Sequence, residues 1–106
     1  FSKMKPNKEM CELFNKMADD TLYDVYILST SPWDNPTAAS EKVAWVKKYL
    51  PKAYKNVILS HHKHLNVGDY LIDDRTANGA GEFGGELIQY GTEKFPTAES
   101  IENYLL

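Results

Sequence analysis

The sequence has few of the features that mark secreted, membrane or nucleic-acid-binding proteins. It contains one cysteine, Cys11, which excludes an internal disulfide and fits a reducing, cytoplasmic compartment. No apolar run approaches the roughly 18 residues that a membrane span needs, and no secretory signal opens the chain. The net charge of −3 is small and spread out, which argues against a nucleic-acid partner. We therefore expect one domain over residues 1–106, with neither a membrane nor a nucleic-acid partner.

Helical and strand patterns alternate along the chain. Asn7 can cap a first helix, a second helix ends near Leu50 before Pro51, and Thr97 can cap a third. Four segments combine apolar, β-branched and aromatic residues as strands do: 23–30, 56–60, 70–73 and 86–90. Strands separated by helices or long loops favour an α/β fold with a doubly wound, mainly parallel, Rossmann-like sheet.

Polar groups that suit phosphoryl transfer stand at the ends of these strands. Thr30 and Ser31 close the first strand, Asp73 and Asp74 close the third, and Lys63 lies between the second and third. Ligands of such sheets bind at the carboxyl ends of the strands, so we expect these side chains to converge on one cleft. Adjacent carboxylates repel each other unless a cation lies against them, and a hydroxyl and an ammonium suit phosphate oxygens. The pattern predicts a phosphate site with a bound cation.

Each of these groups also has an ordinary structural interpretation. Thr30 and Ser31 are compatible with a loop cap, and Lys63 by itself with a surface lysine. The two aspartates are compatible with a solvated turn in which Arg75 is the counter-ion. Their order along one edge of the sheet is what favours a functional site.

These residues resemble motifs of the haloacid dehalogenase superfamily, and within it of the 5'(3')-deoxyribonucleotidases. The resemblance rests on residues 27–33 (second motif), on Lys63 with its ten-residue spacing (third motif) and on residues 71–75 (fourth motif). Residues 42–50 also resemble the helix that follows the second motif. The resemblance covers nearly the whole chain and implies a haloacid dehalogenase-like core.

The resemblance also implies roles for these side chains. Thr30 or Ser31 would hydrogen-bond the transferring phosphoryl group, and Lys63 would neutralise its charge and that of the nucleophile. Asp73 and Asp74 would hold Mg²⁺, with Asp74 as the direct ligand.

Trp33 follows the hydroxyl pair, and the residues alone leave its role open. Stacking on a base, shielding of the site and core packing all fit an aromatic side chain at this position. We expect it to contact the substrate.

The first motif of the family, an Asp-x-Asp that closes the central strand, is absent from the 106 residues. Its first aspartate attacks phosphorus to give an aspartyl-phosphate, and its second acts as acid and base. The pair Asp19-Asp20 is no substitute, because it follows a helix. Since the chain starts at Phe1 without a methionine, we expect a longer parent protein. An upstream segment, or a homodimer mate, would supply a central strand between segments 23–30 and 70–73; direct pairing of these two segments with each other is the alternative.

The implied function is magnesium-dependent hydrolysis of (deoxy)nucleoside monophosphates or other small phosphate esters, with the nucleophile outside this chain. The alternative is a non-catalytic remnant that binds phosphate or a protein partner. A receiver-type signalling domain uses the same residue types, but it places the acidic pair first and the lysine last, which is the reverse of the order found here. Base and sugar preference would lie in an upstream cap and are not encoded in these residues.

Overall fold

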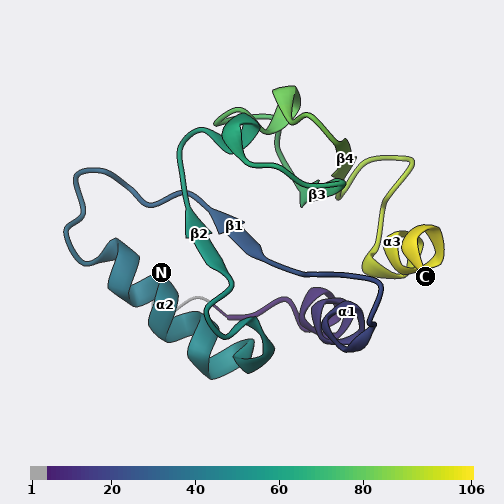
Figure 1. The fold of residues 1–106 in the computed structure, drawn as a ribbon, viewed down its shortest axis with the longest axis horizontal. Helices are drawn as coiled ribbons and strands as arrows, with labels where there is room; N and C mark the ends of the chain where they lie inside the picture. The colour runs from purple at the N-terminus through teal and green to yellow at the C-terminus, as the bar shows by residue number, and fades with distance from the viewer. Residues whose placement is uncertain (1–4) are drawn as a thin grey trace. The chain divides into compact units, whose positions relative to one another are not determined.

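The computed structural model describes residues 5–106, which form two compact units that divide after Ser60 (Figure 1). Both units are mixed α/β, and each contains one pair of parallel strands. Over residues 5–106 no helix has the length and apolarity to cross a membrane; the longest have 12 residues.

Over residues 5–60 the first unit contains two helices, a single 3-10 turn and two strands. In chain order these are α1 (Lys8–Asp19), β1 (Ile27–Ser29), α2 (Ala38–Tyr49), η1 (Pro51–Ala53) and β2 (Val57–Leu59). The predicted cap of α1 is confirmed, because the Asn7 side chain accepts a hydrogen bond of 3.2 Å from the backbone N–H of Met10. Helix α2 ends at Tyr49, within one residue of the predicted position, and its C-cap Leu50 precedes Pro51.

The core of the first unit lies between its helices and its strand pair. Val46, Leu50 and Ala53 form the buried centre, and partly buried residues pack against it from α1, α2 and both strands: Cys11, Phe14, Ile27, Trp45 and Val57. Strands β1 and β2 run parallel, with Ile27 opposite Val57 and Ser29 opposite Leu59.

The first strand is much shorter than the predicted segment 23–30. Its ladder is limited by β2, which begins at Val57 because the chain turns at Ala53 and Asn56 just before it. Tyr26 lies inside the predicted segment but precedes the paired residues, and it is 53% exposed. Strand propensity set the position of this element, and the length of its partner set its extent.

The second unit contains two strands, two 3-10 turns and one helix. In chain order these are η2 (Lys63–Leu65), β3 (Tyr70–Asp73), η3 (Ala80–Glu82), β4 (Glu86–Gln89) and α3 (Ala98–Leu105). Strands β3 and β4 are parallel, with Tyr70 opposite Glu86 and Asp73 opposite Gln89. The positions of both strands agree with the prediction, and η3 lies in the segment between them.

Two isoleucines anchor the packing of the second unit, since Ile88 of β4 and Ile101 of α3 are both fully buried. The predicted cap at Thr97 is confirmed as a capping box: its hydroxyl accepts from the N–H of Ser100, and the Ser100 hydroxyl accepts from the N–H of Thr97.

Each ladder has only two strands. Each of the four strands, β1 and β3 included, therefore has one side without a strand partner among residues 5–106. Parallel strands usually lie inside larger sheets that are covered on both faces.

Candidate functional site

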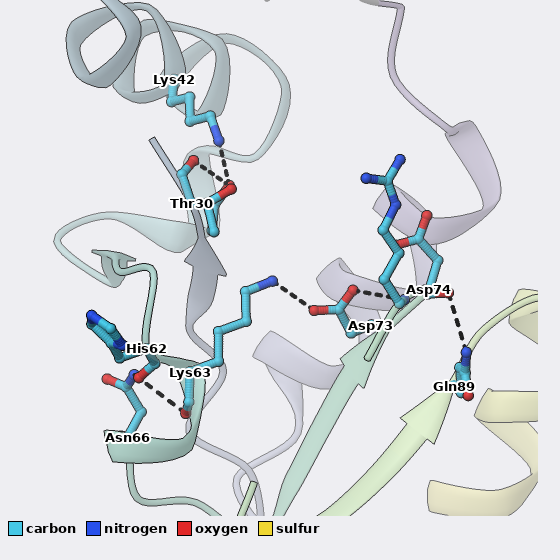
Figure 2. A network of polar contacts seen from close by, with 10 residues as sticks. Thr30, Lys42, His62, Lys63, Asn66, Asp73, Asp74 and Gln89 are labelled. Atoms are coloured by element: carbon cyan, nitrogen blue, oxygen red, sulfur yellow. Dashed lines mark hydrogen bonds and ion pairs between the residues drawn. The ribbon is translucent and has the colours of Figure 1, made fainter. Parts of the chain in front are cut away.

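The carboxyl end of β3 holds a lysine and an aspartate in direct contact. Lys63 opens η2, and its Nζ lies 2.6 Å from Oδ2 of Asp73, the last residue of β3 (Figure 2). Both side chains are only 12% exposed. The structure thus brings together two of the residues that the sequence pattern singled out. The counter-ion of Asp73 is Lys63 rather than Arg75, the partner in the ordinary interpretation.

The second oxygen of Asp73 is occupied as well. Its Oδ1 accepts a hydrogen bond of 3.1 Å from the backbone N–H of Arg75, which fixes the turn that follows the strand. Burial by itself raises the pKa of Asp73, but hydrogen bonds from Lys63 and from the backbone N–H of Arg75, together with the charge of Lys63, hold this pKa below its ordinary value. Asp73 is therefore a fixed carboxylate that stays ionised.

Asp74, unlike Asp73, is exposed to solvent. Its backbone carbonyl accepts a hydrogen bond of 3.4 Å from Nε2 of Gln89 on β4, which ties the turn to the second strand. Its carboxylate is thus presented to solvent beside the fixed carboxylate of Asp73.

Asp73 and Asp74 are the residues that could hold a divalent cation such as Mg²⁺. No group of three or more His, Cys, Asp or Glu side chains with metal-binding geometry occurs in residues 5–106. Mg²⁺ commonly uses one or two protein carboxylates and completes its shell with water and substrate oxygens, so two suffice. The exposed Asp74 is open to a further ligand, whereas both oxygens of Asp73 already accept hydrogen bonds.

The hydroxyl groups predicted to contact phosphate lie in the first unit. Thr30 and Ser31 follow β1 directly and are both half-buried. Their predicted convergence with Lys63 and Asp73 on a single cleft stays a prediction.

A lysine that the sequence reasoning missed lies at this strand end. Lys42 of α2 is buried, with 9% of its surface exposed, and its Nζ donates a hydrogen bond of 2.7 Å to Oγ of Ser29. That hydroxyl in turn donates to the carbonyl of Thr30 at 3.3 Å (Figure 2). The available signal was its spacing, because Lys42 precedes the buried Val46 by four residues and Leu50 by eight, so it shares their helix face.

Burying an ammonium is costly unless oxygens surround it, so Lys42 is an unusual residue to find beneath a strand end. Its contact with the Ser29 hydroxyl places a positive charge at the residue that directly precedes Thr30 and Ser31. Such an arrangement suits an anion.

Trp33 is 88% exposed in the loop that follows the hydroxyl pair. Core packing, one of its three possible roles, is therefore excluded within the described chain.

The other acidic pair has structural partners. Asp19 forms an ion pair of 2.5 Å with Lys52, and Oδ1 of Asp20 accepts the N–H of Leu22 at the end of α1. These contacts agree with the interpretation that Asp19-Asp20 does not replace the missing motif.

Comparison with known proteins links the chain to one family of enzymes. Residues 1–98 match the family model described as 5' nucleotidase, deoxy (pyrimidine), cytosolic type C protein. The chain is also 55% identical to a protein of Vibrio phage KVP40 whose name assigns it to the 5'(3')-deoxyribonucleotidases. That match covers 99% of this chain and 61% of the phage protein, so the chain spans about three fifths of the length of this curated relative.

Proposed function

The chain belongs to the deoxy, cytosolic type C family of 5' nucleotidases, and from this premise we propose that it is part of a magnesium-dependent phosphatase acting on (deoxy)nucleoside monophosphates. The observation that supports the site is the contact between Lys63 and Asp73 at the end of β3, beside the exposed carboxylate of Asp74. A cytoplasmic location, in keeping with the single free cysteine, is part of the same proposal.

The proposed fold is a doubly wound, haloacid dehalogenase-like core. The open side of β1 and the open side of β3 support this proposal, because neither side has a strand partner among residues 5–106. A further strand of the same protein, or of a second copy, would lie there and would carry the nucleophilic aspartate.

Asp74 and Asp73 would hold the magnesium ion, which when bound neutralises charge on the phosphoryl oxygens and orients them. Lys63 keeps Asp73 ionised and places an ammonium at the same strand end. The magnesium ion and the ammonium would together favour a dianionic phosphate over an uncharged ligand, whereas the ionised Asp73 would serve the ion and not the phosphate.

The hydroxyl of Thr30 or Ser31 would donate to a phosphoryl oxygen, and the buried ammonium of Lys42 would add a positive charge at the end of β1. The exposed ring of Trp33 would stack on the nucleobase. In this scheme the residues of the chain bind and orient the phosphate and stabilise its charge in the transition state, whereas a nucleophile outside the chain forms the new bond.

The test is a titration of the purified chain with Mg²⁺ and with inorganic phosphate, followed by NMR. The amide signals of Asp73 and Asp74 should shift with Mg²⁺, and Asp74→Asn should weaken that binding about tenfold or more. The matched control is Asp69→Asn, an exposed aspartate just before β3, which should leave the affinity unchanged. Equal effects of the two variants would contradict the magnesium site.

The affinity for phosphate, measured with and without Mg²⁺, distinguishes the phosphatase from the non-catalytic phosphate-binding protein. A phosphatase site should bind phosphate more tightly when Mg²⁺ is present, because the cation attracts the negatively charged phosphate oxygens. Phosphate binding that is indifferent to Mg²⁺ would instead favour a non-catalytic phosphate-binding protein.

A further inference from the structure

The loop that follows Asp74 contains two consecutive residues in the left-handed backbone region. Asn78 has φ 55° and Gly79 has φ 83°, a region that L-residues rarely adopt and that Asn and Gly tolerate best. The turn is braced from within the loop, since the N–H of Gly81 donates to the carbonyl of Thr76 at 3.0 Å and the adjacent Ala80 is fully buried. Two consecutive residues in this region, directly before η3, call for an explanation.

The turn contacts the first residues of η2. The carbonyl of Asn78 accepts a hydrogen bond of 2.7 Å from the backbone N–H of Lys63. A Cβ added to Gly79 would overlap Nδ1 of His64, and it would come within 3.0 Å of the backbone nitrogen of His64 and 3.1 Å of that of Lys63. The turn therefore packs directly on the first residues of η2, and only glycine allows so close an approach.

These contacts close a ring within the second unit. The loop leaves β3 at Asp73 and Asp74 and returns at Asn78 to hold the backbone of Lys63, while the side chain of Lys63 reaches Asp73. The ammonium and the carboxylate are 2.6 Å apart, so the position of the η2 backbone and the reach of the Lys63 side chain together set this contact.

We propose that the Asn78–Gly79 turn is the positioning element of Lys63, holding its backbone so that its ammonium lies at the end of β3. The importance of this role for phosphate binding depends on the proposed function, whereas the positioning itself does not. Asn78 and Gly79 are thus positioning residues rather than catalytic ones.

The decisive variant is Gly79→Ala, and the chain provides two matched controls. Gly91 also has a positive φ, 90°, but a Cβ there would meet nothing within 4 Å, so Gly91→Ala reproduces the backbone strain without the contact. Gly84→Ala adds a methyl group at an open position of the same unit and controls for the change in the unfolded chain.

The first readout is the ammonium signal of Lys63 in an NMR spectrum of ¹⁵N-labelled lysine side chains, assigned with Lys63→Arg. Because this side chain is 12% exposed and ion-paired, its ammonium protons should exchange slowly in the wild type. Gly79→Ala should accelerate this exchange about tenfold or more, which corresponds to losing one charged hydrogen bond. Both control variants should keep the slow exchange. A slow signal in Gly79→Ala, or its loss in Gly91→Ala as well, would overturn the proposal.

The second readout is the affinity for inorganic phosphate. Gly79→Ala should weaken it about as much as Lys63→Gln does, and Gly91→Ala should not. If the wild type bound no phosphate at all, the proposed function would fail, while the ammonium signal would still decide whether the turn positions Lys63.

Two further variants cover the case in which Gly79→Ala does not fold. Asn78→Ala strains the same turn without adding an atom toward His64, and it should accelerate the exchange of the Lys63 ammonium. Asn78→Gly preserves the turn and should leave the exchange slow. The same rate in both variants would contradict the positioning role.

Discussion

Lys63 and Asp73 stand ten residues apart in the sequence, yet their charged groups lie 2.6 Å from each other, and each side chain is only 12% exposed. An ion pair this well covered is screened less by solvent and salt than one on the surface. Removing one partner would leave the other charge poorly solvated. The contact therefore ties the local structure of the second unit to the ionisation of Asp73.

The first prediction follows from that ionisation. Since the pKa of Asp73 is lowered in the folded chain, the unfolded chain binds its proton first as the pH falls. The stabilisation by Asp73 is present above the unfolded pKa of about 3.9 and is lost as the pH falls from there through the lower folded pKa. Lys63→Gln should therefore reduce the loss of unfolding free energy below about pH 4. Urea denaturation from pH 6 to pH 2.5 measures this difference.

The control for that experiment is Lys47→Gln, which removes the same charge from an exposed position of α2. It should leave the acid limb of the stability curve unchanged. A reduction of equal size in both variants would assign the effect to net charge rather than to the contact with Asp73.

A second prediction concerns Lys42. Lys42→Met keeps the apolar stem and removes a buried charge, so the unfolding free energy should change by less than about 1 kcal/mol or increase. The affinity for inorganic phosphate should nevertheless fall about tenfold, because a charged donor at the end of β1 is lost. Calorimetric titration with inorganic phosphate measures the affinity of Lys42→Met and of the control Lys47→Met. Equal affinities of the two variants would show that Lys42 does not contribute to the site.

A third prediction tests the capping box of α3. Thr97→Ala removes the hydroxyl that accepts from the N–H of Ser100, at 3.2 Å, and should lower the unfolding free energy by about 1 kcal/mol. Thr21→Ala, at an exposed position after α1, is the comparison and should have an effect below about 0.5 kcal/mol. Thermal or urea denaturation of both variants measures the difference. A smaller loss for Thr97→Ala than for Thr21→Ala would show that the cap contributes nothing.

The local signals predicted much of this structure. Caps at Asn7 and Thr97, the end of α2 before Pro51 and the strand positions near Asp73 depend on short-range chemistry that the sequence displays directly. The spacing from Lys63 to Asp73 was likewise informative, because both residues belong to one unit and the chain between them is short.

Other features depend on contacts that no local pattern contains. The first strand was predicted too long because its extent is set by the length of β2. The burial of Lys42 depends on how α2 packs over the end of β1, and a lysine within a charged helix resembles a solvated one until that packing is known. The approach of Gly79 to His64 joins two loops, and each of them looked irregular by itself.

The last prediction concerns turnover by a polypeptide of these 106 residues. With Mg²⁺ and a deoxynucleoside monophosphate, we expect hydrolysis to stay below detection, because hydroxyl, lysine and metal-binding groups stabilise charge but supply no nucleophile. The sequence contains no Asp-x-Asp, and Asp19 and Asp73 are each paired with a lysine. The assay compares the chain with its Asp74→Asn variant, so that a contaminating phosphatase is recognised by equal rates. Turnover that Asp74→Asn abolishes would place a nucleophile within these residues. The proposal that the nucleophile lies outside the chain would then be wrong.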